Sequence, residues 1–199
     1  MKKHTAFPAL AALLVLAMSL TVLAQKEGAK KGGKDKEKAG NQVKKKKGKD
    51  KAEENAEFYM LDSNGPIAGG GYLTVLRNKA GDTYLPIFIG SAEGKAIDSA
   101  IARQRPVRPM THDLIASIVS ELGGEVMSLT VSSLKDNTYI GTLAIKQGKK
   151  THEIDCRPSD GMGIAFRTGA DIKVMPEVVK QAGMTGQEML LKGYPVSNP

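Results

Sequence analysis

Charged side chains cluster where a predicted strand passes into a predicted helix, in the segment DCRPSD at 155–160. Strand alternation places the side chains of Asp155 and Arg157 on the face opposite Cys156. The proline that follows ends the strand and a serine offers a helix N-cap, so Asp160 falls in the first turn, where the helix dipole favours negative charge. We therefore expect two carboxylates and a guanidinium at a single strand-to-helix corner.

Two interpretations of this corner stay open. Arg157 is either an ion-pair partner of Asp155 on the same strand face or a guanidinium fork presented to a phosphate. Gly161 and Gly163 each cost up to about 1 kcal/mol in a helix relative to alanine, which tight packing on the sheet or close approach of a ligand would explain. Cys156, the single cysteine, reads as a small core residue, with a reactive thiol as the alternative.

A second carboxylate lies on the apolar side of the helix predicted at 91–103. Glu93 falls within the stripe made by Ala96, Ile97, Ala100 and Ile101. It either caps the helix start behind Ser91 or is a functional acid or metal ligand with a shifted pKa.

The helix predicted at 112–122 begins with a Thr-His-Asp sequence. We expect Thr111 to be its N-cap, His112 to lie at the border of the apolar stripe, and Asp113 to point away from that stripe. The stripe is predicted to be buried and consists of Leu114, Ile115, Ile118, Val119 and Leu122. From the local sequence alone, Asp113 is expected to stabilise the start of this helix, and His112 is expected to have a structural role.

Composition divides the chain into three parts. Residues 1–24 have a basic start, an apolar run and a small-residue site ending at Ala24, which predicts a secretory signal peptide. An uncleaved membrane anchor is the alternative, because the run is near the minimum length of about 18 residues for a span. We expect the protein to be exported, either periplasmic or secreted.

A lysine-rich, low-complexity segment follows at 25–56 and is predicted to be disordered. Between 26 and 51 it has 12 Lys against 4 acidic residues, a net charge of +8, whereas 52–199 has 15 basic and 17 acidic residues. The segment is either a solvated spacer or an electrostatic tether to anionic lipid, an envelope polymer or nucleic acid.

Residues 57–199 have the pattern of one α+β domain. Strands are predicted at 58–62, 71–78, 82–90, 125–134, 138–147, 150–157 and 171–175, and helices at 91–103, 112–122, 160–168 and 177–183. This order favours a mixed, largely antiparallel sheet with helices packed between and beside strand meanders. Paired cysteines, His-x-x-x-His spacing and a phosphate loop are missing from the sequence, which excludes the strong zinc and nucleotide signatures.

Five blocks together resemble, in order and spacing, the bifunctional nuclease (BFN, DUF151) domain family over residues 82–183. They are 85–90, Glu93 with Ala96-Ile97, 108–114, 136–139 and 155–160. The resemblance implies a compact α+β domain, often dimeric, and for some plant members nuclease activity on DNA and RNA. Gly94-Lys95 and the glycine-containing helix 161–166 depart from the family's usual residues.

The leading hypothesis is therefore an exported nuclease that hydrolyses phosphodiester bonds of DNA or RNA. Glu93, Asp155 and Asp160 would hold Mg²⁺ or Mn²⁺, which takes oxygen ligands. Arg157 would neutralise the phosphate, His112 would act as general acid or base, and Asp113 and Asp160 are the other catalytic candidates.

The rival hypothesis is a non-catalytic binding or scaffold module tethered to the envelope by its basic tail. The nearly neutral charge of 52–199 favours it, because proteins that grip nucleic acid usually display a basic surface.

Overall fold

The computed structural model describes residues 55–197. The predicted signal peptide and almost all of the predicted lysine-rich tail lie outside the described residues. Within 55–197, none of the helices combines the length and the apolar character needed to cross a membrane.

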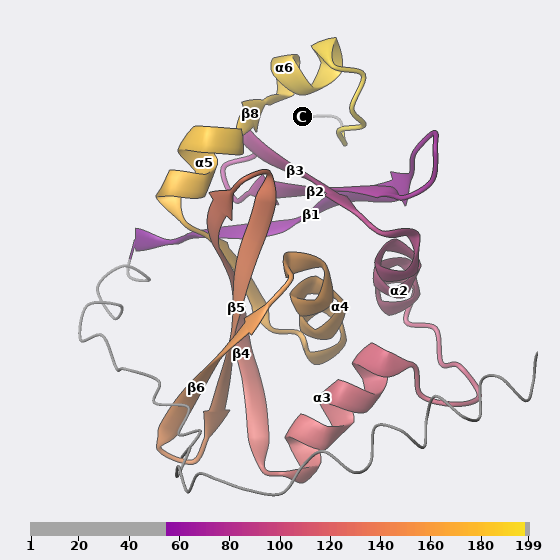
Figure 1. Ribbon diagram of the computed structural model, residues 1–199, viewed down its shortest axis with the longest axis vertical. Helices are drawn as coiled ribbons and strands as arrows, with labels where there is room; N and C mark the ends of the chain where they lie inside the picture. The colour runs from indigo at the N-terminus through magenta and orange to yellow at the C-terminus, as the bar shows by residue number, and fades with distance from the viewer. Residues whose placement is uncertain (1–54, 198–199) are drawn as a thin grey trace, which may run out of the picture. The chain divides into compact units, whose positions relative to one another are not determined.

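Eight strands form one sheet in the order β6-β5-β4-β7-β1-β2-β3-β8 (Figure 1). Every pairing is antiparallel except that of β4 with β7, which is parallel. The strands are β1 (Glu57–Pro66), β2 (Tyr72–Asn78), β3 (Thr83–Ile89), β4 (Gly124–Lys135), β5 (Thr138–Gln147), β6 (Lys150–Cys156), β7 (Asp171–Val174) and β8 (Met184–Thr185). The predicted mixed, largely antiparallel sheet is confirmed.

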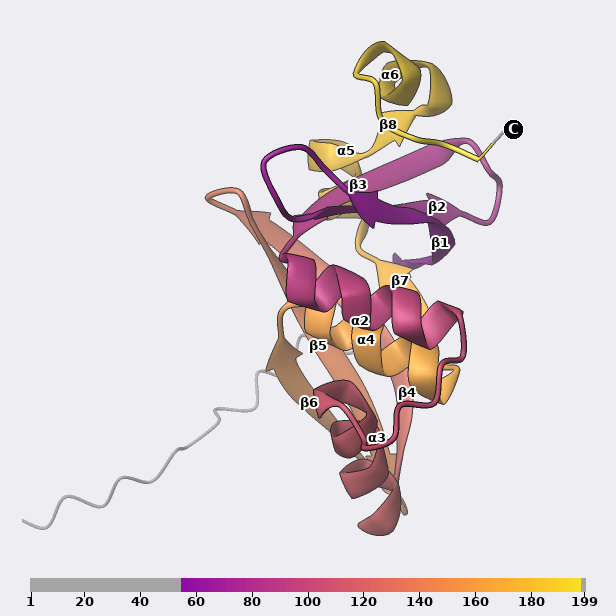
Figure 2. The same ribbon diagram turned by 90° about the vertical axis from the view of Figure 1, so that its right-hand side faces the viewer.

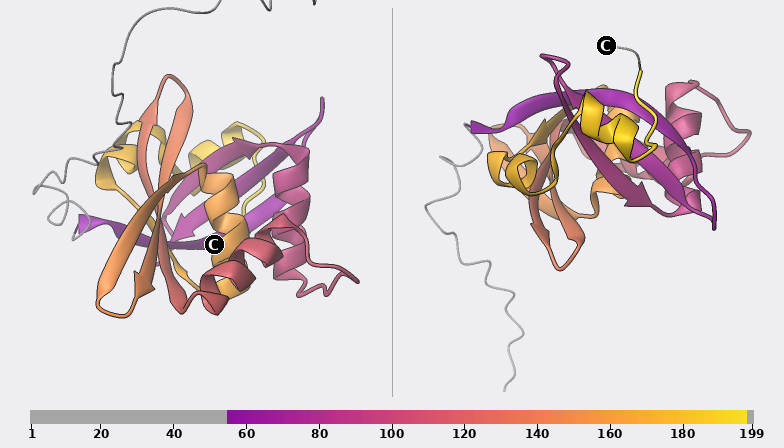
Figure 3. Two further views of the ribbon diagram at one scale, coloured as in Figure 1. Left: turned by 60° about the horizontal axis from the view of Figure 1, so that its bottom comes forward. Right: turned by 90° about the horizontal axis from the view of Figure 1, so that it is seen from above.

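The helices of the described region are α2 (Ser91–Ile101), α3 (Thr111–Glu121), α4 (Pro158–Thr168), α5 (Pro176–Ala182) and α6 (Gly186–Leu191). Helix α4 packs on strands β4 and β5 and contacts both α2 and α3, while α2 also contacts β1 and β2, and α3 also contacts β4 (Figures 2 and 3). The short elements β8 and α6, which the sequence analysis did not predict, lie at the opposite end of the domain from α3 (Figure 1). This arrangement is the α+β class expected from the sequence.

Apolar side chains of the sheet and of α4 form the main core. Leu129, Val131 and Val174 on the strands and Met162 on α4 are almost completely buried there. Each fully buried side chain of this size contributes about 1.5–3 kcal/mol relative to exposure. Helix α4 is thus the central packing element, and its start is fixed firmly against the sheet.

Glycines allow α2 and α4 to pack closely. A Cβ atom at Gly94 would lie 2.1 Å from Cγ of Tyr72, and one at Gly161 would lie 2.4 Å from Cδ1 of Leu129 on β4. Both distances are too short for any real side chain. Tight helix-on-sheet packing, one of the two explanations offered for Gly161, is therefore correct.

The predicted buried stripe of α3 is partly wrong. Leu114, Ile118 and Leu122 are 51%, 47% and 68% exposed, whereas His112 is only 8% exposed. Two stripes repeat at helical spacing on α3: Leu114, Ile118 and Leu122 form one, and His112, Ile115 and Val119 form the other. The second stripe is the one that packs on α4 and β4. An exposed apolar stripe, which we call the α3 stripe (Leu114, Ile118 and Leu122), is left on the outside of the helix.

Candidate functional site

Arg157 occupies the corner between β6 and α4. It is the N-cap residue of α4, and Asp160 lies in the first helical turn. Because these residues are three apart, the guanidinium can meet the carboxylate in two places. Nε donates to Oδ2 of Asp160 over 2.7 Å, and Nη2 donates to Oδ1 over 3.0 Å. The expected carboxylate and guanidinium are therefore together, and their contact is bidentate.

Glu93 reaches the same guanidinium from α2. Its Oε1 lies 2.7 Å from Nη2 of Arg157, and its side chain is 18% exposed. The apolar side of α2 faces α4, which explains why a carboxylate on that side finds a cation at the start of α4. The N-cap of α2 is Gly90, and Glu93 lies in the first turn as expected, where its negative charge is also favoured by the helix dipole.

His112 joins the group from the first turn of α3. Its Nε2 lies 3.5 Å from Oδ1 of Asp160. The ring packs on α4 so closely that a Cβ atom at Gly163 would lie 2.7 Å from Cδ2 of His112. Gly163 is thus required for the approach of the histidine. We call Glu93, His112, Arg157 and Asp160 the Arg157 cluster.

Asp113 belongs to a second ion pair, beside this cluster. It was expected to point away from the buried side of α3, but its carboxylate turns to α4 and pairs with Nε of Arg167. It also accepts a hydrogen bond from the backbone N–H of Met110 at 2.9 Å, which is the expected helix-start chemistry. The N-cap is Met110, and not Thr111 as predicted.

Arg167 connects three helices through this pair, and the sequence analysis missed it. Its Nη1 donates to the carbonyl of Ala96 on α2 over 3.0 Å and to that of Gly163 over 2.8 Å, and its side chain is 9% exposed. The available signal was helical spacing, because Asp160, Gly163 and Arg167 share one face of α4. In the sequence, an arginine in the last turn of a helix suggests only a favourable dipole contact.

The pKa of Asp113 reflects this environment. Partial burial acts to raise the pKa of the carboxyl, but the hydrogen bonds from Arg167 and from the Met110 backbone, with the charge of Arg167, outweigh it. The pKa of Asp113 therefore lies below its ordinary value. Asp113 is a charged residue that holds α3 to α4.

Comparison with known proteins shows the family to which this domain belongs. A family model described as the bifunctional nuclease domain matches residues 74–187. The chain belongs to the bifunctional nuclease domain family. The match contains every residue of the Arg157 cluster and both members of the Asp113–Arg167 pair.

Two relatives of the bifunctional nuclease domain are uncharacterized proteins of Mycobacterium tuberculosis, one from strain CDC 1551 / Oshkosh and one from strain H37Rv. Each is 37% identical over 110 residues, which is 55% of this chain and 65% of the relative. The chain thus matches less than two thirds of the length of these relatives.

Asp155 lies apart from the Arg157 cluster. Its strand β6 is at the edge of the sheet, and alternation directs Asp155 to the face opposite Cys156, whose sulfur approaches Gly161 of α4. The predicted Asp155–Arg157 ion pair is wrong, because Arg157 turns to Glu93 and Asp160. Burial, and then the charges of Asp155 and Asp160, raise the pKa of Cys156 to about 11, so its thiol has core character.

The carboxylates as arranged do not fit a resident divalent cation. Within residues 55–197 no three His, Cys, Asp or Glu side chains are grouped to hold a metal ion. Glu93 and Asp160 face each other across the guanidinium of Arg157, which occupies the position between them. Mg²⁺ prefers several oxygen ligands in near-octahedral order, and this pair would offer its oxygens only if Arg157 moved away.

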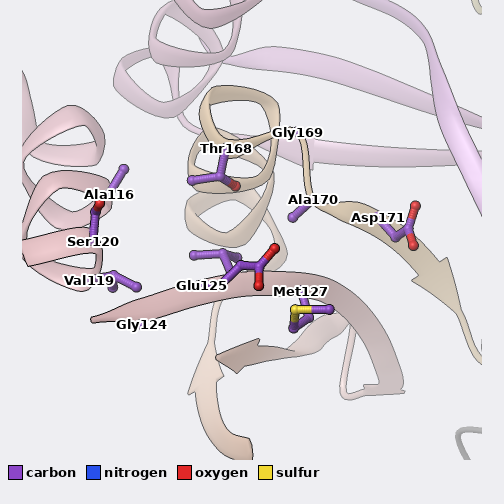
Figure 4. Close-up of a pocket in the computed structure, with 11 residues that line it drawn as sticks. Ala116, Val119, Ser120, Gly124, Glu125, Met127, Thr168, Gly169, Ala170 and Asp171 are labelled. Atoms are coloured by element: carbon purple, nitrogen blue, oxygen red, sulfur yellow. The ribbon is translucent and has the colours of Figure 1, made fainter. Parts of the chain in front are cut away.

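A pocket of the bifunctional nuclease domain lies elsewhere. It has a volume of about 420 Å³ and lies where α3, β4 and the end of α4 meet (Figure 4). Its carboxylates, Glu125 and Asp171, belong to β4 and β7, and it shares no lining residue with the Arg157 cluster. We assign the candidate site to the Arg157 cluster because its charged groups converge on one another, whereas the pocket is an open surface hollow.

Proposed function

We propose that this domain binds a phosphodiester of nucleic acid at Arg157 and hydrolyses it. One observation carries the proposal. Arg157 is held through Nε and Nη2, while no group in the described part of the chain accepts a hydrogen bond from Nη1, and the side chain is 67% exposed. A guanidinium fixed by carboxylates, with one edge of donors open to solvent, matches the geometry of a phosphate.

The other members of the Arg157 cluster supply acid–base groups. Asp160 is 32% exposed and can accept a proton from an attacking water, while His112, 3.5 Å away, orients that carboxylate. The water oxygen attacks phosphorus and the bond from phosphorus to the leaving oxygen breaks. Asp160 then gives the proton that it took from the water to this leaving oxygen, which departs as a hydroxyl group. Glu93 keeps Arg157 at the corner.

Local charge explains why cation assistance belongs to the proposal. Glu93, Asp160 and Arg157 sum to a formal charge of −1, and a phosphodiester brings a further −1. A proton on His112 would offset this repulsion. So would Mg²⁺ or Mn²⁺ on the carboxylates, provided that Arg157 moves to the phosphate. No step of the hydrolysis described above requires such an ion. Assays with and without it show whether the reaction depends on a divalent cation.

The decisive test is Asp160→Asn in the full chain. We expect hydrolysis of a plasmid and of an RNA substrate to fall at least about tenfold, which is roughly 1.4 kcal/mol of transition-state stabilisation. Rates are measured with chelator, with Mg²⁺ and with Mn²⁺. The matched control is Asp171→Asn on β7, outside the cluster, which should keep the wild-type rate. Full activity in a folded Asp160→Asn protein would remove Asp160 from the site.

A specific observation favours the rival, non-catalytic module. Residues 55–197 contain 15 basic and 15 acidic residues, so the domain has no excess of positive charge. In that case the Arg157 cluster is a closed ion-pair network, and the lysine-rich segment provides the affinity for anionic polymers. Replacing the 12 Lys of 26–51 by Gln should then abolish binding to nucleic acid and to anionic vesicles alike. Retained nucleic-acid affinity would exclude this alternative.

Export and tethering are part of the same proposal. We infer that the leader is removed after Ala24 and that the lysine-rich segment then associates with an anionic envelope component. Mass spectrometry of the exported protein tests the cleavage. A mass that includes Met1 would mean that the leader stays as an anchor.

We further propose that the domain forms a dimer through the α3 stripe. Leu114, Ile118 and Leu122 are spaced four residues apart and expose apolar surface on one side of α3. Contiguous exposed apolar surface of this kind is typical of interaction sites.

A further inference from the structure

The connection between α2 and α3 is a basic and exposed segment outside the Arg157 cluster. Arg103, Arg105 and Arg108 lie within six residues, and every residue from 101 to 110 is exposed. Val107 at its centre is fully exposed. We call these three arginines the α2–α3 arginines.

These arginines have no protein partner in residues 55–197. No hydrogen bond or ion pair engages their side chains, and the nearest carboxylates in the sequence are occupied. Asp98 accepts a hydrogen bond from Asn64 at 2.7 Å, and Asp113 pairs with Arg167. Three unpaired guanidinium groups therefore project into solvent from a single loop.

This concentration of charge stands out because the domain as a whole is neutral. The other arginines of the described residues have partners: Arg77 pairs with Asp62, Arg167 pairs with Asp113, and Arg157 pairs with Glu93 and Asp160. Nucleic acid is bound through local positive surface, so a neutral total does not exclude binding. The α2–α3 arginines provide such a surface.

The loop connects two helices that each contribute to the Arg157 cluster. Glu93 belongs to α2, and α3 begins three residues after Arg108 and carries His112. Four residues span at most about 14 Å, so the backbone of Arg108 lies within that distance of His112. This is about four base-pair steps along a duplex strand at 3.4 Å each. One nucleic acid can therefore contact both places.

We propose that Arg103, Arg105 and Arg108 bind backbone phosphates of nucleic acid and so hold the strand next to the Arg157 cluster. This inference rests on the proposed function, because it takes nucleic acid as the ligand of the domain. The α2–α3 arginines would bind phosphates of the nucleic acid other than the phosphodiester that reacts. Guanidinium groups suit this role because they bind phosphate oxygens with paired donors.

The test measures binding of the full chain to a fluorescent duplex DNA by anisotropy, over a range of salt concentrations. In the variant Arg103→Gln, Arg105→Gln, Arg108→Gln, affinity at 0.1 M salt should fall at least about tenfold, and the slope of log K against log salt should become shallower by about 2–3. The three arginine side chains are exposed and have no hydrogen-bond or ion-pair partner in residues 55–197, so the melting temperature should stay unchanged.

The matched control removes the same charge elsewhere. Lys146, Lys149 and Lys150 are exposed in the β5–β6 hairpin, and Lys150 is seven residues of extended strand from Arg157, about 23 Å. Their replacement by Gln should change the slope by much less. Equal losses in the two triple variants would mean that only net charge matters and would overturn the inference.

The design separates this inference from the proposed function. Loss of binding in the arginine variant, with no hydrolysis by the wild type, would support the α2–α3 arginines and reject the nuclease. Hydrolysis by the wild type, with unchanged binding in the arginine variant, would reject the inference and leave the nuclease standing. A variant that loses affinity for phosphatidylglycerol vesicles but keeps its affinity for DNA would also overturn it.

Discussion

At the scale of single residues, the surroundings of a side chain decide what its chemistry can be. Arg157 is the N-cap of α4 and Arg167 lies in its last turn, yet Arg157 is 67% exposed with an open edge of donors, whereas Arg167 is 9% exposed and uses its Nε and Nη1 to hold α3 and α2. Only Arg157 can meet a ligand without breaking the fold. The hydrogen bonds and charges of Asp160 and Glu93 raise the pKa of Arg157, so its positive charge is permanent.

Cys156 allows a direct test at this scale. Burial raises the pKa of its thiol to about 11, so at pH 7.5 the thiolate should be about a hundredfold scarcer than for a thiol of pKa 9. Alkylation of the native chain by iodoacetamide should be correspondingly slow, and its rate should keep rising up to about pH 11. Measured rates that level off near pH 9 would contradict the burial of this thiol.

At the scale of elements, the contacts of α4 with α2 and α3 position the site. Arg157, Asp160, Gly163 and Arg167 all belong to α4 or its N-cap. Successive turns of α4 contact Glu93 on α2, His112 on α3 and the carboxylate of Asp113. These contacts fix the positions of α2 and α3 relative to α4. Gly163 allows the closest of these contacts.

The Asp113–Arg167 pair should make this helix packing sensitive to acid. The pKa of Asp113 is lowered in the folded state, so the unfolded chain takes up the proton first as pH falls. The stabilisation is complete above the ordinary aspartate pKa of about 4 and is lost as pH falls through the lower folded value. Melting temperatures between pH 6 and 2.5 should therefore fall more steeply for the wild type than for Asp113→Asn.

Exposed carboxylates elsewhere provide the control for that experiment. In Asp171→Asn on β7, the melting temperature should fall between pH 6 and 2.5 as steeply as in the wild type. Parallel curves for Asp113→Asn and the wild type would show that the ion pair contributes nothing to stability near pH 4.

At the scale of the whole molecule, charge and apolar surface are unevenly distributed. The segment 26–51 carries +8, while residues 55–197 are neutral in sum, with three unpaired arginines in the α2–α3 connection. Apolar side chains are exposed along the α3 stripe. The surfaces proposed to bind polyanions and a second copy of the chain therefore lie on different segments of the molecule.

The proposed dimer is tested with Ile118→Ser. This change removes apolar area from the centre of the α3 stripe and should weaken self-association at least about tenfold, since burying one such side chain contributes about 1.5–3 kcal/mol. The control is Leu191→Ser on α6, which is 81% exposed at the other end of the domain. Sedimentation equilibrium gives the masses. A monomeric wild type, or an equal effect of both changes, would exclude this interface.

Local patterns in the sequence determined most of the elements. Period-2 alternation, helix spacing and turn residues predicted β2 to β7 and α2 to α5 to within a few residues. The tight β4–β5 turn is a clear case, because Asp136 and Asn137 both have positive φ and belong to the residue types that tolerate it. The missed elements, β8 and α6, are too short for a periodic pattern, and contacts with β3 stabilise them.

Only the tertiary structure decided which of the candidate residues meet. The sequence named Glu93, His112, Asp113, Asp155, Arg157 and Asp160, and packing brought four of them together, paired Asp113 with Arg167, and left Asp155 on the other face of the sheet. The rotation of α3 also followed from packing, because two apolar stripes compete on that helix. Periodicity is a property of a few neighbouring residues, whereas an ion pair between helices depends on contacts between segments that lie far apart in the chain.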